Sequence, residues 1–307
     1  MIMTNPIQPP PGTLPFGADA AHFTPGLYLV ATPIGNAADI TLRALALLGR
    51  ADLVACEDSR VTGPFLKRYG IAATLFPYHE HNAAKVRPQL LARLQAGAVV
   101  ALVSDAGTPL VNDPGYKLVR DCIAAGIAVT ALPGPSAVLA GLSLSGLPSD
   151  RFLFAGFPPA KDGARRSWLA ELKPLRATLV MLESAQRLAD SLATMADVLG
   201  PAREAAVARE LTKKFEEVRR GSLAELASHY AAAGAPKGEI TLVVGPPAED
   251  DSPGAEDLDA ALRAALARLP LRRAVDEVAA TLGLSRKPVY ARALELRDAA
   301  GEDDGPQ

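Results

Sequence analysis

The clearest indication of the fold is the segment Leu102-Val103-Ser104-Asp105-Ala106-Gly107-Thr108-Pro109. An apolar run over residues 99–103 ends abruptly in this small and polar segment, and sequence compatible with a helix resumes after Pro114-Gly115. The order is typical of a parallel strand whose carboxyl end leads through a loop into a helix, which is where open α/β sheets bind ligands. The backbone of such a loop can approach a ligand closely, and Asp105 can bind polar atoms. The alternative for this loop alone is a tight connection without a ligand.

Two similar loops occur on either side of this segment. One follows the apolar run 27–31 and reads Thr32-Pro33-Ile34-Gly35-Asn36, and the other follows the run 129–132 and reads Pro133-Gly134-Pro135-Ser136-Ala137. Further strands are expected at 51–56 and 74–78, and helices at 42–49, around 65–70, at 86–94 and at 118–125. This alternation predicts a mainly parallel sheet with helices on both faces, in which the three loops converge on one ligand.

The pattern restarts near Pro148 and predicts a second, smaller α/β unit. Its expected strands are 152–156, 178–182, 205–208 and 240–244, with an edge-like segment at 215–219. Its expected helices are 167–172, 188–199 and 223–230, and residues 158–166 are expected to form a basic loop. A cleft between two such units is the default ligand site.

The last part of the chain differs in pattern. Residues 247–257 are rich in Pro, Gly, Asp and Glu and predict a linker, whereas 258–299 are helical in pattern. Within them, 274–294 contain a helix, a turn with Gly283, Ser285 as a cap, and a second helix that begins with basic residues, which is typical of a helix-turn-helix. A three-helix bundle used for dimerisation is the alternative. The expected domains are therefore 25–148, 149–246 and 258–299, with disordered tails at 1–24 and 300–307.

Composition limits the function classes. The 307 residues include 32 Lys and Arg against 34 Asp and Glu, so a net charge of −2 gives no global positive field, and a nucleic-acid partner requires local basic clusters. The two cysteines, Cys56 and Cys122, lie in or beside apolar runs and are expected to be buried thiols in a reducing compartment. No run approaches the ~20 apolar residues of a membrane span, and no secretory signal is recognised, so we expect a cytoplasmic protein.

Several stretches together resemble one family. They are LVATPIGN (29–36), DITLRAL (39–45), ACEDSR (55–60), SDAGTP (104–109) with DPG (113–115), PGPSA (133–137) and RELTKKFE (209–216). In this order they are similar to the methyltransferase I family of small-subunit ribosomal RNA, a branch of the tetrapyrrole methylase superfamily. The resemblance implies S-adenosylmethionine as cofactor, two α/β domains with the cofactor in the cleft between them, and a homodimer. It also implies 2′-O-methylation of a cytidine ribose in the decoding region.

The resemblance also implies which residues contact the cofactor. They are Pro33, Gly35, Asp105, Ala106, Gly107, Thr108, Val111, Ser136, Ala137, Leu182, Leu211 and Thr241. One departure concerns Leu182-Glu183-Ser184-Ala185-Gln186, where the family usually has an aromatic-Glu-Ser-Pro-His pattern. Gln186 does not titrate, so a histidine is not available there for proton transfer.

A ribose 2′-hydroxyl is a weak acid and needs a proton acceptor, or cations that stabilise the developing alkoxide. Charged candidates stand at expected strand exits: Glu57, Asp58, Glu183, Glu210 and Lys213. The spacing of Glu210 and Lys213 predicts an ion pair that keeps the carboxylate ionised. Surface salt bridges or helix caps are the alternative for each.

RNA contacts are expected from basic residues in local clusters and from polar strand exits. The candidates are Arg60, His79, Arg165, Arg166, Lys214, Arg286 and Lys287. We expect no metal site, because His79-Glu80-His81-Asn82 offers ligands on one loop only. Two other hypotheses stay open. One is a methylase of the same superfamily that acts on a small tetrapyrrole, and the other is a non-catalytic nucleic-acid-binding protein that senses a ligand.

Overall fold

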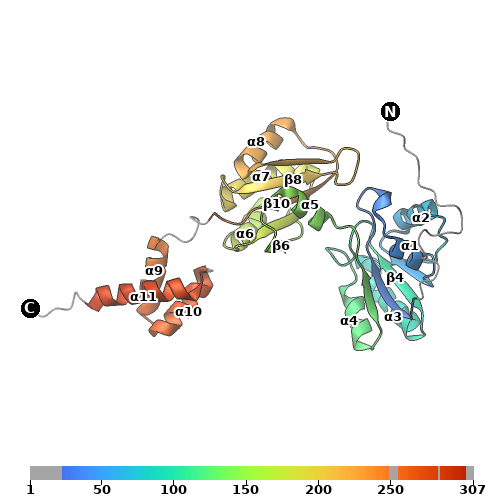
Figure 1. Ribbon diagram of the computed structural model, residues 1–307, viewed down its shortest axis with the longest axis horizontal. Coiled ribbons are helices and arrows are strands. Elements are labelled where there is room, and N and C mark those ends of the chain that lie inside the picture. Colours follow the sequence, from blue (N-terminus) through green and yellow to red (C-terminus); the bar gives the residue numbers. More distant parts are fainter. Residues whose placement is uncertain (1–22, 249–254, 283, 302–307) are drawn as a thin grey trace, which may run out of the picture. The chain divides into compact units, whose positions relative to one another are not determined.

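The computed structural model describes residues 23–248, 255–282 and 284–301 (Figure 1). The expected tails at 1–24 and 300–307 and the expected linker at 247–257 lie largely outside these residues. Contacts divide the chain into two units. One comprises the residues up to Gly141 together with Glu210–Glu217, and the other comprises Leu142–Arg209 and the chain from Val218 onward.

The first unit contains the predicted parallel sheet. Its strands are β1 (Gly26–Val30), β2 (Leu53–Cys56), β3 (Leu75–Pro77), β4 (Val99–Val103) and β5 (Val129–Leu132), in the order β3-β2-β4-β1-β5. All of the neighbouring pairs are parallel. The connecting helices are α1 (Leu42–Leu48), α2 (Ser59–Arg68), α3 (Glu80–Gln95) and α4 (Tyr116–Ala124).

Helices cover both faces of this sheet, as expected. Alternate residues of the central strands enter two separate apolar clusters, one with α1 and α2 and the other with α3 and α4. Figure 1 shows these two pairs of helices on opposite sides of the sheet. The neighbouring strands β1 and β4 therefore lead to helices on opposite faces. Their outgoing loops diverge there, which is the arrangement that opens a ligand site at the carboxyl edge.

Side-chain caps set where the helices begin. The Thr41 hydroxyl accepts a hydrogen bond from the Ala44 N–H at 3.2 Å and starts α1 as predicted. Helix α3 begins six residues earlier than expected, at Glu80 rather than 86. The Asn82 side chain causes this, because its Oδ1 accepts from the His79 N–H at 2.9 Å while its Nδ2 donates to the Pro77 carbonyl at 3.0 Å.

Two helices differ from the sequence prediction. Helix α5 (Ala137–Ser145) was not expected, because AVLAGLSLS is apolar on all sides and carries no amphipathic period. Helix α6 (Asp162–Leu172) includes residues expected to form a basic loop. Asp162 pairs with Arg165 and Arg166 one turn further on, and these pairs favour an earlier helix start.

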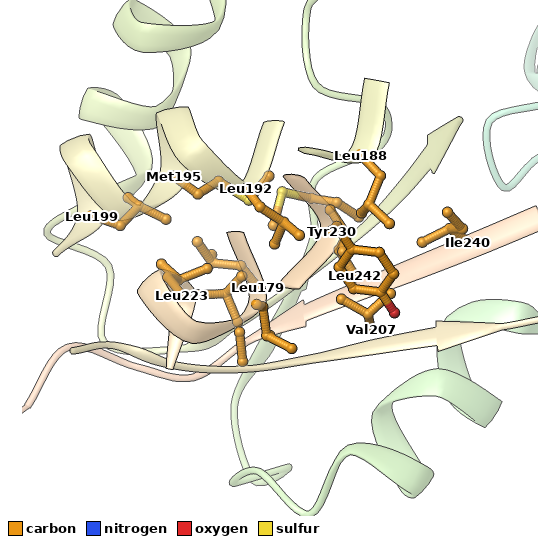
Figure 2. Close-up of a cluster of buried hydrophobic side chains, with 14 of the residues drawn as sticks. Leu179, Leu188, Leu192, Met195, Leu199, Val207, Leu223, Tyr230, Ile240 and Leu242 are labelled. Atoms are coloured by element: carbon orange, nitrogen blue, oxygen red, sulfur yellow. The ribbon is translucent and has the colours of Figure 1, made fainter. Parts of the chain in front are cut away.

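The second unit contains a mixed sheet. Its strands are β6 (Phe152–Phe154), β7 (Thr178–Ser184), β8 (Glu204–Arg209), β9 (Glu217–Ser222) and β10 (Glu239–Val244), in the order β6-β7-β10-β8-β9. β6 is parallel to β7, whereas β10 is antiparallel to both of its neighbours. Figure 2 shows α7 (Leu188–Leu199) placing Leu188, Leu192 and Met195 over sheet residues such as Val207 and Leu242. Helix α8 (Leu223–Ala233) contributes Leu223 and Tyr230 to the same core.

The C-terminal helices form a bundle of their own. They are α9 (Ala255–Leu266), α10 (Leu271–Leu282) and α11 (Arg286–Gly301), and each of them contacts the other two. Leu262, Val275 and Val289 are fully buried at their centre. Within the described ranges, no helix combines the length and the apolar character needed to cross a membrane.

Candidate active site

The loops that follow β1 and β4 are bonded to each other at the carboxyl edge of the first sheet. The Thr32 N–H donates to the Gly107 carbonyl at 2.9 Å, and the Gly107 N–H donates back to the Thr32 carbonyl at 3.0 Å. The Thr32 hydroxyl also donates to the Ser104 carbonyl at 3.1 Å. Gly107 has φ +80°, a conformation that favours glycine, so its place in this junction depends on residue type.

The loop after β5 joins this pair. The Thr108 hydroxyl donates to the Pro135 carbonyl at 3.0 Å. A Cβ on Gly134 would lie 2.8 Å from the Ala31 Cβ, so only glycine permits this approach. The prediction that the three loops converge is thus confirmed.

Carboxylates gather beside these loops. The Asp58 N–H donates to Asp105 Oδ1 at 3.1 Å, which places the loops after β2 and β4 together. Burial raises the pKa of Asp105. The hydrogen bond from the Asp58 N–H opposes this shift, and the Asp58 charge adds to it. Burial also raises the pKa of Glu57, with a further contribution from Asp105, while His79 opposes the shift.

Asp113 belongs to this cluster and was missed as a site candidate. Burial, followed by the charge of Glu57, raises its pKa to about 6. A hydrogen bond from Ser104 acts in the opposite direction. The available signal is the segment Asp113-Pro114-Gly115, which carries a carboxylate directly after the central loop.

Asp58 caps helix α2, which begins at the next residue. Its Oδ1 accepts from the Arg60 N–H at 2.8 Å and caps α2, and its Oδ2 lies 2.6 Å from Arg60 Nη2. The hydrogen bonds from Arg60 lower the pKa of Asp58. Asp58 therefore fills the role of a helix cap, whereas the Arg60 side chain stays 88% exposed and open to a phosphate.

The segment Glu210–Glu217 belongs with the first unit although it joins two strands of the second sheet. The predicted ion pair is confirmed, because Lys213 Nζ lies 2.8 Å from Glu210 Oε1. The Asn36 N–H donates to the Thr212 hydroxyl at 3.0 Å, which ties the segment to the loop after β1. Leu211, an expected cofactor contact, is buried here.

The structure argues against the predicted catalytic role of Glu183. Its side chain is 0% exposed, and its Oε1 lies 2.5 Å from Arg187 Nη2. The Ser191 hydroxyl donates to Oε2 at 2.5 Å, and the Ser184 N–H donates to Oε1 at 2.7 Å. These bonds use the carboxylate inside the unit, so we reassign Glu183 to a structural role.

Leu182 and Thr241, both expected to contact the cofactor, lie side by side. They are directly paired in the register of β7 and β10. Their neighbours Met181 and Leu242 face the helices α7 and α8, so Leu182 and Thr241 occupy the opposite face of the sheet. Val111 is exposed, while Ser136 and Ala137 are half-buried at the start of α5.

Among the expected RNA contacts, Arg165 requires correction. It is 5% exposed, its Nε donates to the Thr194 hydroxyl at 3.1 Å, and its Nη2 donates to Asp162 Oδ1 at 3.0 Å. A phosphate cannot reach a guanidinium enclosed in this way, so Arg165 holds α6 on α7. Arg166 pairs with Asp162 and Asp197 but keeps 45% exposure.

The side chains of the other candidates are at least partly exposed, and their contact with RNA stays a prediction. His79 is half-buried, and Lys214, Arg286 and Lys287 are exposed. Arg286 Nε also lies 2.5 Å from Asp276 Oδ1, across the turn between α10 and α11. Over the part of the chain that the structure describes, no group of three or more His, Cys, Asp or Glu side chains is arranged to hold a metal ion.

Comparisons with known proteins decide the family. The family model described as Tetrapyrrole (Corrin/Porphyrin) Methylases matches residues 26–227, and the model described as RsmI C-terminal HTH domain matches residues 252–297. A protein of Mesorhizobium japonicum named ribosomal RNA small subunit methyltransferase I is 56% identical over 93% of this chain and 97% of its own length. The chain belongs to the ribosomal RNA small subunit methyltransferase I family of tetrapyrrole methylases.

Other members and solved structures agree. The Escherichia coli O157:H7 member of this methyltransferase I family is 47% identical over 88% of this chain and 94% of its own. A uroporphyrin-III-C-methyltransferase from Thermus thermophilus matches with a TM-score of 0.52 and 26% identity, over 71% of this chain and 93% of that one. A diphthine synthase, at 16% identity and a TM-score of 0.54, shows the same fold. The predicted tetrapyrrole-methylase-like fold with a C-terminal helix-turn-helix is confirmed.

Proposed function

We propose that this chain transfers a methyl group from S-adenosylmethionine to the 2′-oxygen of a cytidine ribose in the decoding region of small-subunit ribosomal RNA. The observation that carries the proposal is the 56% identity to a ribosomal RNA small subunit methyltransferase I over 93% of the chain. The chain includes the residues matched by the C-terminal model, which a methylase acting on a small tetrapyrrole does not require. Convergence of the three glycine-containing loops supplies a place for the donor.

The residues at the carboxyl edge of the first sheet fit the cofactor. The bonded loops around Gly107 and Gly134 bring backbone close together without side chains between them, and Asp105 adds a half-buried carboxylate for polar atoms. When bound, S-adenosylmethionine supplies a methyl group that its sulfonium already activates. The loops bind and orient it, and alignment of the reacting groups accounts for roughly 7–11 kcal/mol in well-oriented reactions.

The proton of the ribose hydroxyl requires an acceptor on this chain. We propose Glu57 for that role, because burial and Asp105 raise its pKa and make it a stronger base than an ordinary carboxylate. Lys213, held by Glu210 at 2.8 Å, supplies positive charge for the developing alkoxide. Phosphate contacts are assigned to Arg60, Arg166, Lys214, Arg286 and Lys287, with His79 beside the same edge as Glu57.

We also propose that two copies of the chain form a homodimer that works in the cytoplasm, where ribosomal subunits assemble. Apolar side chains on an edge strand of the second sheet support this. Strand β6 ends the sheet order, and its Phe152 and Leu153 are 43% and 37% exposed. Edge strands with apolar side chains are avoided on free surfaces, since they favour association. Light scattering of the purified full-length chain tests this, with a monomer mass rejecting it.

The methyl transfer is tested with labelled S-adenosylmethionine and small ribosomal subunits from a strain that lacks the modification. Label in 2′-O-methylcytidine of the RNA supports the proposal. Label in a tetrapyrrole but not in RNA supports the superfamily alternative, and RNA binding without label supports a non-catalytic binder. Either of these two results overturns the proposal.

Cofactor binding by the central loop is tested with Asp105→Ala. We expect S-adenosylmethionine to bind at least about tenfold more weakly, because a hydrogen bond to a charged group is lost. Asp52→Ala is the matched control. Asp52 Oδ2 also accepts a backbone bond, from the Val99 N–H at 2.8 Å, but at the amino end of β4. Calorimetry that shows equal affinities for the two variants would reject a cofactor role for Asp105.

A further inference from the structure

The loop between β8 and β9, residues 210–216, is built in an unusual way. Four non-glycine residues of the described chain have positive φ, and two of them, Glu210 at 50° and Thr212 at 65°, lie in this loop. The other two, Leu110 and Asn112, lie in the loop after β4. Such backbone persists only where surrounding contacts enforce it, and it concentrates at functional sites.

Bonds within the β8–β9 loop hold this conformation. The Thr212 N–H donates to Glu216 Oε2 at 2.6 Å, and the Glu216 N–H donates to the Lys213 carbonyl at 3.1 Å. The Lys213 N–H donates to the Glu210 carbonyl at 3.0 Å, in addition to their ion pair. The loop is therefore closed on itself and presents its remaining side chains in a fixed direction.

The same loop is fixed against the loop after β1. The Asn36 N–H bonds to the Thr212 hydroxyl, and a Cβ on Gly35 would lie 2.5 Å from Lys213 Cγ. Because of this close contact, glycine is the residue that fits at position 35. The β8–β9 loop thus stands directly beside Pro33 and Gly35, the predicted cofactor contacts of the loop after β1.

This fixed loop presents an exposed aromatic ring. Phe215 is 65% exposed, and the Lys214 ammonium lies 5.5 Å from its ring centroid. An exposed aromatic ring on a fixed loop, with a cation beside it, offers a flat apolar face and a positive charge together. Proteins recognise unpaired RNA by stacking splayed bases on aromatic side chains, with neighbouring cations on the phosphates.

We propose that Phe215 and Lys214 form a stacking platform for one unpaired base of the RNA substrate, next to the nucleotide that is methylated. The inference rests on the proposed function and specifies which part of the chain holds the RNA there. The ring supplies the stacking surface and the ammonium meets the adjacent phosphate. An RNA partner is favoured over a second copy of the chain, because the cation beside the ring and the position next to the cofactor loop suit a polyanionic substrate.

Three substitutions separate stacking from simple apolar contact. Phe215→Ala removes the ring, Phe215→Leu keeps apolar bulk without an aromatic face, and Phe215→Tyr keeps the face. Ile123→Ala is the matched control, since Ile123 is equally exposed at 65% but lies near the end of α4, away from the carboxyl edge. Each variant is assayed for methylation of unmodified small ribosomal subunits, for S-adenosylmethionine affinity and for mass by light scattering.

We expect the KM for small subunits to rise about tenfold in Phe215→Ala and Phe215→Leu, which corresponds to about 1.4 kcal/mol. Phe215→Tyr and Ile123→Ala should stay within about twofold of the wild type, with S-adenosylmethionine affinity unchanged throughout. A KM that is equal in all variants overturns the platform, as does a Leu variant that behaves like wild type. A halved mass in Phe215→Ala also overturns it and makes Phe215 a subunit contact. If the wild type itself transfers no methyl group to RNA, the proposed function fails instead.

Discussion

Carboxylates that follow strands have different surroundings in the two sheets of this chain. In the first unit, Glu57, Asp105 and Asp113 are partly exposed, and burial raises the pKa of each, with a further contribution from neighbouring carboxylates. In the second unit, Glu183 is fully enclosed by Arg187, Ser191 and its own backbone neighbour. Internal hydrogen bonds and an ion pair therefore keep Glu183 from acting on a bound molecule, whereas the three carboxylates of the first unit stay accessible.

The largest effect on stability is expected from substitution of the enclosed carboxylate, Glu183. Glu183→Gln leaves the Arg187 guanidinium without its anion. Because this guanidinium is 30% exposed, we expect a loss of about 2 kcal/mol of unfolding free energy, which is less than for a fully buried pair. We expect the methylation rate per folded molecule to stay near that of the wild type, because the role of Glu183 is structural. Urea unfolding and active-enzyme titration measure the two quantities.

The matched variant is Glu57→Gln in the first unit. Among the described residues no cation is paired with its carboxylate, so the unfolding free energy should change by less than about 0.5 kcal/mol. The methylation rate should fall instead, by about 100-fold for a lost general base. If Glu183→Gln loses activity with unchanged stability, the assignment of the two carboxylates is reversed.

The convergence of the three loops gives a second test. Gly134→Ala places a methyl group 2.8 Å from the Ala31 Cβ and should lower the unfolding free energy by about 2 kcal/mol. Ala31→Gly removes the obstructing atom, so the double variant should lose less than the sum of the two single variants.

Gly163→Ala is the control for this cycle. No atom of the described residues lies within 4 Å of a Cβ at that position, and its φ is not in the left-handed region. Because it lies in the first turn of α6, alanine there should stabilise the chain by at most about 0.5 kcal/mol. Strict additivity of Gly134→Ala and Ala31→Gly would mean that the two loops do not touch in solution.

Much of the first sheet could be predicted from local sequence. Apolar runs followed by small residues mark β1, β4 and β5, and the spacing of three residues predicts the Glu210–Lys213 pair. Two of the failures come from contacts between residues far apart in the chain. Arg165 is buried by Thr194 from α7, and the β8–β9 loop is fixed by Asn36, 176 residues away from Thr212. Periodicity and spacing contain no information on such pairs.

For Glu183, a local signal in the sequence indicated its structural role. Arg187 stands four residues after Glu183, a spacing that favours an ion pair on a helical turn. That spacing distinguishes Glu183 from Glu57, whose neighbour Arg60 is instead bound by Asp58. Candidate carboxylates should therefore be compared with the cations three and four residues away before a catalytic role is assigned.

The smallest expected effect is the pH dependence of Asp113. Its pKa is raised from 3.8 to about 6 in the folded chain, so between these values the folded state binds more protons than the unfolded state. The contribution of this group to stability therefore falls as pH rises through that window and stays lower above it. Asp113→Asn removes the cost, so it should raise the melting temperature above about pH 6, by at most about 3 °C because water screens a partly exposed group.

The advantage of Asp113→Asn should shrink as the pH falls and vanish near pH 4, where the wild-type carboxyl of the folded chain is protonated. Asp150→Asn is the control, because it removes the same formal charge at an exposed position. Its melting temperature should differ little from that of the wild type across the pH range. Thermal unfolding of the three proteins between pH 4 and pH 8 measures this. A constant offset between Asp113→Asn and wild type would show that the carboxylate cluster beside the loops is as well solvated as the surface. The contrast with the enclosed Glu183 would then rest on hydrogen bonding alone.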